Sequence, residues 1–338
     1  MHLSRVSIVI LFMLAMPVLA HHSPSKYNMA QMVTVTGTLK KVDWSNPHVY
    51  IYMEETTPAG ATLEWEIECF PPSLLRRMGW TKETLRIGET LTVRGNPGKN
   101  PKYKDLFPSV IKRGDRPLFA LADVLKETSA PPAKAASLNG VWSTALDMRV
   151  MSQAASPAMS TLTPRGVEAR KRYDEDTSPT SHCVPSPPPL WMITPELKRV
   201  TLGKDSILIE SEQAGVHRTI HLNSSSHEGA LPSIQGHSIG RWEDGSLVVD
   251  TAQFAYHGIG NGGGNGISAG VPSSTRKHLI ERFTPNADGA SLTYSFELTD
   301  PEYLAVPRKG SVRWSFSPRA AFTAEKCELD IARRYMKN

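Results

Sequence analysis

The chain has 338 residues, with 38 Lys and Arg against 33 Asp and Glu, and a formal net charge of +5. This length accommodates two domains, and the 40% of apolar and 21% of charged residues exclude disordered and fibrous proteins. Short alternating runs, interrupted by many of the 24 Gly and 26 Pro residues, favour β-structure and exclude a helical bundle.

Residues 1–20 have the features of a secretory signal peptide. They contain the basic residue Arg5, then the apolar run SIVILFMLAM, and they end in Val18-Leu19-Ala20. The apolar run is shorter than the roughly 20 residues of a membrane helix, so we expect no membrane span in the mature chain. The mature protein is therefore predicted to begin at His21 and to be periplasmic or secreted.

Residues 21–115 are predicted to form an OB-like barrel of five strands. The alternating runs MVTVTGTLKKVDW and HVYIYMEE flank the turn signal Asn46-Pro47 and predict two antiparallel strands. The strand LEWEIECF follows, and then the short helix LLRRM, which Ser73 would cap and Gly79 would end. The runs ETLTVRG and FPSVIKR complete the order of three strands, one helix and two strands that is typical of an OB-fold.

The third strand of this domain predicts one buried and one acidic face. Alternation places Trp65, Ile67 and Cys69 together, opposite three glutamates, Glu64, Glu66 and Glu68. We therefore expect Cys69 to be a buried free thiol. An acidic face does not suit a phosphate chain, and no dense Lys/Arg stripe appears elsewhere, so the sequence predicts no nucleic-acid partner.

The three cysteines predict a single disulfide in an oxidising compartment. With Cys69 buried in the first domain, Cys183 and Cys327 remain as partners. A bridge that closes so long a loop is expected to stabilise the fold by roughly 4 to 5 kcal/mol in the chain-entropy treatment.

Residues 116–137, rich in Ala, Pro, Ser and Lys, are predicted to be a linker to a second domain at residues 138–338. Gly140-Val141-Trp142 near its start is similar to the Gly-x-Trp motif of lipocalins. Eight alternating runs then predict an antiparallel, lipocalin-like β-barrel: RVTLG, SILIES, VHRTIHL, HSIGRW, SLVVDT, KHLIERF, SLTYSFEL and VRWSFS. The Gly-rich segment Gly258 to Gly270 between two of them lacks the Gly-Lys-Ser/Thr ending of a phosphate loop, and it predicts a lid or loop.

Both halves of the chain resemble uncharacterised exported protein families. The segments HHSPSKY, VTVTGTLKKVDWSNPHVYIY and LLRRMGWTKETLRIGETLTVRG resemble a bacterial family whose mature chains begin His-His-Ser, over roughly Met29 to Val110. The segments CVPSPPPLWMITP, GVHRTIHL, QGHSIGRWEDGSLVVDT, KHLIERF and TDPEYL resemble a second, β-rich exported domain. The chain departs from that second pattern in GIGNGGGNGISAG and PSPPP, and neither resemblance implies a known reaction.

The leading functional prediction is a carrier or sensor that binds a small-molecule ligand, mainly apolar or mildly anionic, inside the second barrel. Such barrels close around cavities, and these strands mix apolar residues with a few ionic groups. Alternation turns Arg218 inward, where it needs a carboxylate from Asp250 or Glu281, or a bound anion. The predicted ligand-binding residues are His217, Arg218, Trp242 and Arg282.

An alternative prediction is a periplasmic hydrolase or lyase in the same barrel. His237 or His278 would act as the base, and Asp250 or Glu281 would orient it. The same groups could instead form a structural ion-pair network at the barrel mouth, and the sequence favours this interpretation over a catalytic site. A zinc site made by His217, His237 and His278 would lack the close ligand spacing of most zinc sites.

A third prediction is a copper site at the mature N-terminus. The free amine and imidazole of His21, with His22 beside them, offer nitrogen ligands suited to Cu(II). The alternative is a flexible polar tail after the cleavage site.

Overall fold

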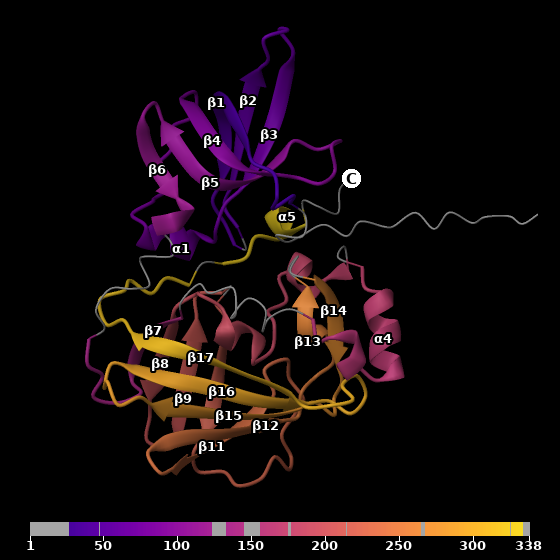
Figure 1. Cartoon of the computed structure of the whole chain (residues 1–338). Helices are drawn as coiled ribbons and strands as arrows, with labels where there is room; N and C mark the ends of the chain where they lie inside the picture. Colours follow the sequence, from indigo (N-terminus) through magenta and orange to yellow (C-terminus); the bar gives the residue numbers. More distant parts are fainter. Residues whose placement is uncertain are drawn as a thin grey trace, which may run out of the picture.

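The computed structural model describes residues 27–46, 48–123, 133–144, 156–174, 177–213, 215–264, 268–324 and 326–333. Two β-barrels, one from each half of the chain, lie one above the other in Figure 1. The predicted all-β class is therefore confirmed. The signal peptide at residues 1–20 and the copper ligands His21 and His22 lie outside the described residues and stay predictions.

The first barrel has the strand order expected of an OB-fold. Its long first strand pairs with the second and fourth strands, and parallel pairing of the third with the fifth closes the barrel. The helix lies between the third and fourth strands, as predicted. The elements are β1 (Val33–Asp43), β2 (Tyr50–Thr56), β3 (Thr62–Glu68), α1 (Pro72–Arg77), β4 (Thr90–Pro97) and β5 (Asp105–Arg113).

Helix α1 begins earlier than the sequence pattern predicted. Pro71 is its N-cap and Pro72 its first residue, because proline is well tolerated in the first turn of a helix. The prediction that Ser73 caps the helix is therefore wrong, and this side chain is buried inside the first turn. Gly79 follows the helix with a φ of 81°, the left-handed conformation that suits glycine at a helix end.

The linker prediction is wrong at its start. Residues Arg116–Ala120 form strand β6, which pairs antiparallel with β5 at the edge of the first sheet. Phe119 from this strand is buried in the first core, so the first domain extends beyond its predicted end at residue 115.

The third strand of the first domain behaves as predicted on one face only. Cys69, just after β3, is a fully buried free cysteine, as predicted. Glu68 was expected on the exposed acidic face, but it is 7% exposed and accepts a 2.6 Å hydrogen bond from the Tyr27 hydroxyl. The segment that carries Tyr27 forms a β-bridge with Gly98, and this long-range contact cannot be read from strand alternation.

In its described residues the second domain is a closed barrel of nine strands rather than eight. The added strand, β7, contains Trp142 and joins the barrel between β8 and β17. The pairing of β10 with β11 is parallel, unlike the other pairs of the barrel. The strands are β7 (Gly140–Thr144), β8 (Lys198–Leu202), β9 (Ser206–Ser211), β10 (His217–His221), β11 (His237–Glu243), β12 (Ser246–Ala252), β15 (His278–Pro285), β16 (Ser291–Thr299) and β17 (Arg308–Phe316).

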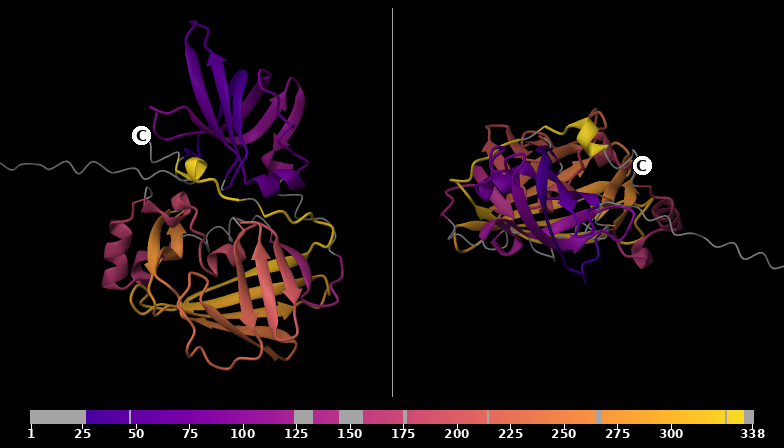
Figure 2. Two further views of the ribbon diagram at one scale, coloured as in Figure 1. Left: turned by 180° about the vertical axis from the view of Figure 1, so that it is seen from behind. Right: turned by 90° about the horizontal axis from the view of Figure 1, so that it is seen from above.

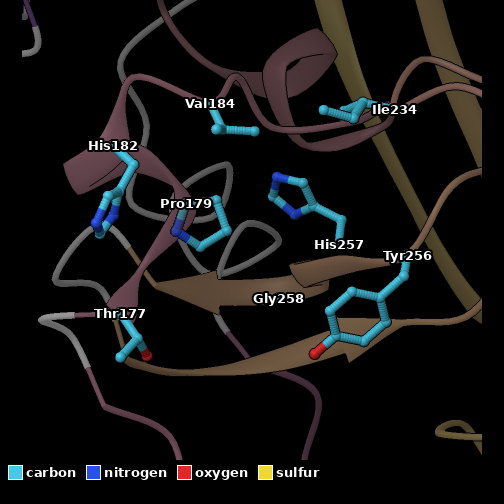
Figure 3. A pocket seen from close by; sticks show the side chains of 8 residues that line it. All are labelled: Thr177, Pro179, His182, Val184, Ile234, Tyr256, His257 and Gly258. Carbon is cyan, nitrogen blue, oxygen red and sulfur yellow. The ribbon is translucent and has the colours of Figure 1, made fainter.

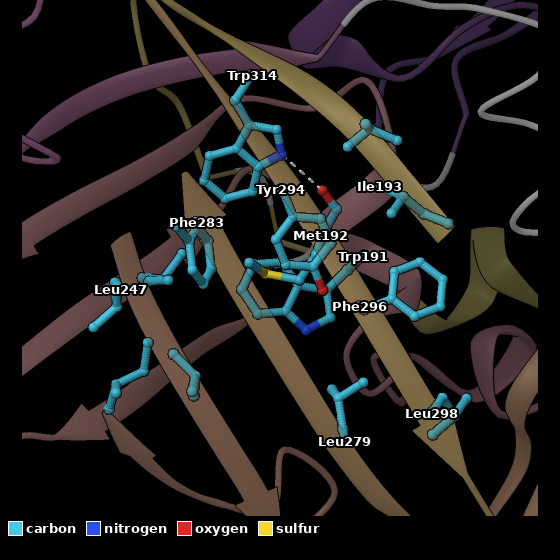
Figure 4. Packing of buried hydrophobic residues seen from close by; sticks show 14 of the residues in the cluster. Trp191, Met192, Ile193, Leu247, Leu279, Phe283, Tyr294, Phe296, Leu298 and Trp314 are labelled. Carbon is cyan, nitrogen blue, oxygen red and sulfur yellow. Dashed lines mark hydrogen bonds between the residues drawn. The ribbon is translucent and has the colours of Figure 1, made fainter. Parts of the chain in front are cut away.

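The interior of the second barrel is filled by its own side chains (Figure 4). The 3₁₀ turn η4 (Leu190–Ile193) inserts Trp191, Met192 and Ile193, and all three are fully buried. Trp314 stacks on Tyr294 with ring centroids 5.7 Å apart, and its indole donates a hydrogen bond to the Met192 carbonyl at 3.2 Å. Because close-packed side chains fill its interior, the barrel is a rigid scaffold.

The Gly-rich segment forms a two-stranded sheet, so the prediction of a lid or loop is wrong. Strands β13 (His257–Gly264) and β14 (Ser268–Ser273) pair antiparallel, and helix α4 (Pro164–Lys171) packs against β14. The glycines are needed for close contact, because a Cβ atom at Gly260 would collide with the side chain of Ser273.

The predicted Cys183–Cys327 disulfide is confirmed. Such bridges are typical of extracytoplasmic proteins. Cys183 follows the turn η3 (Pro179–His182), and Cys327 precedes helix α5 (Leu329–Ala332). Figure 1 and the left view of Figure 2 place α5 between the two barrels, and Cys327 forms a β-bridge with Asn46 of the first domain.

An ion pair also joins the two domains. Arg77 Nη1 lies 2.7 Å from Glu212 Oε2, and the Glu212 side chain is only 1% exposed. Among the described residues, no helix combines the length and apolarity of a membrane span.

Candidate functional site

Four histidines and one aspartate gather on the outer face of the second barrel. His221 ends β10, His237 begins β11, Asp250 lies near the end of β12, and His278 begins β15. The neighbouring residues Ile220, Ser238, Thr251 and Leu279 are buried, so alternation turns the polar side chains outward. The fifth member, His227, comes from the connection between β10 and β11. We call His221, His227, His237, Asp250 and His278 the histidine cluster.

Hydrogen bonds connect four members of the histidine cluster in a row. Asp250 Oδ1 lies 2.8 Å from His278 Nε2 and 3.1 Å from His227 Nε2. His227 Nδ1 in turn lies 2.9 Å from His237 Nδ1. The ring of His221 stacks on that of His237, with centroids 4.9 Å apart. Each ring is therefore fixed by a neighbour from a different element.

The chemistry of Asp250 determines where the protons of this row lie. An ionised carboxylate can only accept, so His227 and His278 both donate to it from Nε2. A neutral His227 then has a lone pair at Nδ1, which must accept the Nδ1 proton of His237. As a result, His237 Nε2 has a free lone pair.

The surroundings of His237 favour its neutral form. Partial burial lowers the pKa of His237, and the neighbouring rings of His221 and His227 lower it further. Among the described residues, no group of three or more His, Cys, Asp or Glu is arranged to hold a metal ion. Since the two ring nitrogens of His227 face different partners, the histidine cluster is arranged as a hydrogen-bond relay.

Glu281 and Arg218 lie inside the barrel and not in the histidine cluster. Their side chains are 0% and 1% exposed, and two hydrogen bonds of 2.8 and 2.9 Å join them. Arg218 thus turns inward as predicted, and Glu281 is the carboxylate that neutralises it. Asp250, the other candidate partner, lies on the outer face.

The remaining sequence-predicted ligand residues do not converge. His217 is exposed at the start of β10, the strand that His221 ends. Trp242 is 51% exposed near the turn from β11 to β12, and Arg282 Nη2 lies 2.9 Å from Glu243 Oε2 beside that turn. The structure therefore brings His237, His278 and Asp250 together, and keeps His217, Trp242 and Arg282 apart from them.

His227 was missed by sequence reasoning. It lies outside the strands, in a polar connection where no periodicity indicates which way a side chain points. The sequence offered one signal, since His227 is a histidine close in sequence to His221 and His237. On that ground it could be expected to form a hydrogen bond with one of them. The stacking of His221 on His237 depends on the pairing of β10 with β11, which the sequence does not specify.

A pocket of about 530 Å³ lies beside the barrel, between the segment around η3 and the start of β13 (Figure 3). Ile234, from the connection that also carries His227, forms part of its wall. The disulfide at Cys183 holds another part of the pocket wall, because its sequence neighbours His182 and Val184 both line the pocket. The full lining is Thr177, Pro179, His182, Val184, Ile234, Tyr256, His257 and Gly258.

His257 is the buried polar group of this pocket. It is 3% exposed, and its Nδ1 accepts a 3.3 Å hydrogen bond from the Ile259 amide. The ring proton therefore lies on Nε2, which makes no hydrogen bond within the part of the chain that the structure describes. Burial, with a further contribution from Lys277, lowers the pKa of His257 to about 3, although the Pro185 carbonyl opposes this. The pocket wall thus contains a neutral donor that makes no well-formed hydrogen bond among the described residues, with only the Pro185 carbonyl acting on it.

Comparison with known protein families finds a match in the first half of the chain. Residues 9–107 match the profile of a family of unknown function, DUF6152. This match covers most of the first barrel and agrees with the resemblance seen in the sequence. No curated protein matches the chain.

Proposed function

We propose that the protein is an exported carrier or sensor that binds a small, uncharged organic molecule in the pocket at His257. The observation that carries this proposal is the buried His257 Nε2, which makes no well-formed hydrogen bond to any described residue. A buried donor without a partner costs roughly 1 to 3 kcal/mol, and a ligand with an accepting oxygen or nitrogen would recover that cost. This ligand site lies beside the barrel and not in its lumen, which side chains fill.

The pocket has the size and chemistry of a small-molecule site. Its volume of about 530 Å³ falls within the range of roughly 300 to 1,000 Å³ that is usual for such sites. Pro179, Val184 and Ile234 supply apolar walls, and Tyr256 and His182 supply polar groups. This combination suits a mainly apolar ligand with one or two polar atoms.

The charge of the ligand follows from the state of His257. With a pKa of about 3, its ring stays neutral at ordinary pH and cannot balance a buried anion. An unpaired charge is expensive to bury, so the pocket favours an uncharged molecule. This narrows the ligand class expected from the sequence, which included mildly anionic molecules.

Periplasmic or secreted localisation is part of the same proposal. The disulfide supports an oxidising compartment, and residues 1–20 support export through a signal peptide. A binding protein in such a compartment would meet small molecules from outside the cell.

Fluorescence titration with prodan, an uncharged naphthalene ketone, tests the pocket. We expect saturable binding with a blue-shifted emission in the full-length protein. His257→Phe keeps an aromatic ring but removes the donor, so affinity should fall by roughly five- to tenfold, the equivalent of one hydrogen bond. His257→Gln keeps a donor and should retain most of the affinity.

Trp242→Ala is the matched control, because it removes an exposed aromatic side chain outside the pocket. It should bind prodan as the unmodified protein does. Absence of saturable binding, or equal affinity in His257→Phe, would overturn the proposal.

A further inference from the structure

The hydrogen-bond row in the histidine cluster ends at one atom with a free lone pair, His237 Nε2. The opposite side of the same ring is held by His227 at 2.9 Å, and His227 is held by Asp250 at 3.1 Å. A base whose far side is oriented by a carboxylate is the usual arrangement for general acid–base catalysis. Here a second imidazole stands between the base and the carboxylate.

This arrangement stabilises a proton taken up from outside. When His237 Nε2 gains a proton, the Nδ1 proton of His237 can pass to His227 Nδ1. The positive charge then lies on His227, whose Nε2 already faces the Asp250 carboxylate. Opposite charges at this separation stabilise each other, so the row favours proton uptake at His237 Nε2.

We propose that His237 is the catalytic base of an acid–base site on the outer face of the second barrel, which hydrolyses uncharged acyl substrates such as esters. His227 and Asp250 are positioning residues that act through it. The proposal is independent of ligand binding in the pocket at His257.

The site is open to substrate and water. The Asp250 and His278 side chains are 33% and 43% exposed, and His237 itself is partly exposed. The side-chain hydrogen bond of His237 goes to His227, and none goes to a hydroxyl or thiol among the described residues, so the proposed nucleophile is water. Asp250 is the charged member of the cluster while the rings are neutral, and its negative charge disfavours anionic substrates.

The reaction is balanced without a cofactor. His237 Nε2 takes a proton from water as the water oxygen bonds to the acyl carbon of the ester. The C–O bond to the alcohol then breaks, and His237 Nε2 returns the proton to the departing oxygen. The products are a carboxylic acid and an alcohol, and the imidazole ends in its starting state.

Hydrolysis of p-nitrophenyl acetate by the full-length protein tests this proposal. General acid–base catalysis contributes roughly 10²- to 10⁴-fold, so His237→Gln should lower kcat/KM by at least about tenfold after correction for the reaction in buffer. His217→Gln removes an exposed histidine of the same barrel and should leave the rate unchanged. A rate in His237→Gln equal to that of the unmodified protein would overturn the proposal.

The pH profile separates positioning from a structural role. The rate should rise with pH through an apparent pKa below 6.5, because the pKa of His237 is lowered by burial and by His221 and His227. Asp250→Asn removes the carboxylate that favours proton uptake, so it should lower kcat and move this midpoint to lower pH. An unchanged midpoint in Asp250→Asn would refute the positioning role.

Imidazole ¹⁵N NMR of the unmodified protein tests the row without any variant. We expect His237 to carry its proton on Nδ1, and His227 and His278 to carry theirs on Nε2. Observation of an Nε2 proton on neutral His237 would overturn the assignment of the base, even if His237→Gln failed to fold.

Discussion

Arg218 and Glu281 face each other inside the second barrel through two hydrogen bonds of 2.8 and 2.9 Å. The Tyr294 hydroxyl donates a third bond to Glu281 at 2.7 Å, and Arg218 Nε makes no hydrogen bond to any residue that the structure describes. The two charges are therefore balanced almost entirely by each other and not by water.

This pair predicts a large effect of removing one charge. Glu281→Gln leaves the Arg218 guanidinium buried without its counter-charge, so the free energy of unfolding should fall by roughly 3 to 5 kcal/mol. The double variant Arg218→Met/Glu281→Leu removes both charges and should recover most of that loss. Urea denaturation followed by tryptophan fluorescence measures both, and a double variant no more stable than Glu281→Gln would contradict the prediction.

The inward direction of Arg218 could be predicted from sequence, because its strand alternates and an inward arginine needs a carboxylate. Two acids, Asp250 and Glu281, were left as partners because the choice depends on which face of the neighbouring strands each occupies. The register of β12 with β15 decides this by pairing Val249 with Glu281 on the inner face. Register depends on long-range packing, which a single sequence does not display.

The histidine cluster, too, could be predicted from the sequence only in part. His237, His278 and Asp250 were recognisable by type, and strand alternation placed them in a barrel wall. His227 joins them from a connection between strands, and only the folded chain brings it to Asp250. The filled lumen was equally hidden, because the residues that fill it come from the turn η4 and not from an alternating strand.

Two buried lysines predict that stability rises with pH. Burial lowers the pKa of Lys277 to about 7, and burial likewise lowers that of Lys198 to about 7. Between pH 7 and the ordinary lysine value of 10.5, the unfolded chain binds more protons than the folded one, so alkaline pH favours folding. Each lysine contributes a slope of at most about 1.4 kcal/mol per pH unit.

Urea midpoints at pH 7, 8 and 9 should therefore increase in the unmodified protein. Lys277→Met should flatten this rise, whatever its effect on absolute stability. Lys204→Met, at an exposed position between β8 and β9, is the control and should keep the full slope. A slope in Lys277→Met equal to that of the control would show that Lys277 is charged when folded.

Removal of the disulfide should weaken both stability and the pocket. Cys183→Ala/Cys327→Ala opens a loop with a sequence separation of 144 residues, and the expected loss is roughly 2 to 5 kcal/mol. Prodan affinity should also fall, because Cys183 holds the pocket residues His182 and Val184 in place. Thermal unfolding with and without reductant measures the loss of stability, and fluorescence titration measures the loss of prodan affinity.

Cys69→Ala is the control for this experiment, because the free cysteine lies in the other core. Reductant should lower the unfolding temperature of Cys69→Ala but not that of the double variant. An equal response of the two proteins would contradict the assignment.

The mature N-terminus predicts copper binding. With the predicted signal peptide removed after Ala20, the amine and imidazole of His21 are expected to chelate Cu(II). One extra glycine before His21 separates the amine from that imidazole and should weaken Cu(II) binding strongly. Isothermal titration with Cu(II) alone measures this, and equal affinity for the two N-termini would refute the site.

If the chain is exported as proposed, the burial of Cys69 affects the order in which its cysteines can pair. A chain that emerges from its N-terminus presents Cys69 before Cys183, and Cys183 well before Cys327. Simple oxidation in order of appearance would join the first two, which is the wrong pair. Burial in the folded first barrel raises the pKa of the Cys69 thiol and removes the reactive thiolate. If the first barrel folds as it emerges, Cys69 cannot form a disulfide with Cys183. The Cys183 thiol then stays reduced until the last part of the chain brings Cys327 to it.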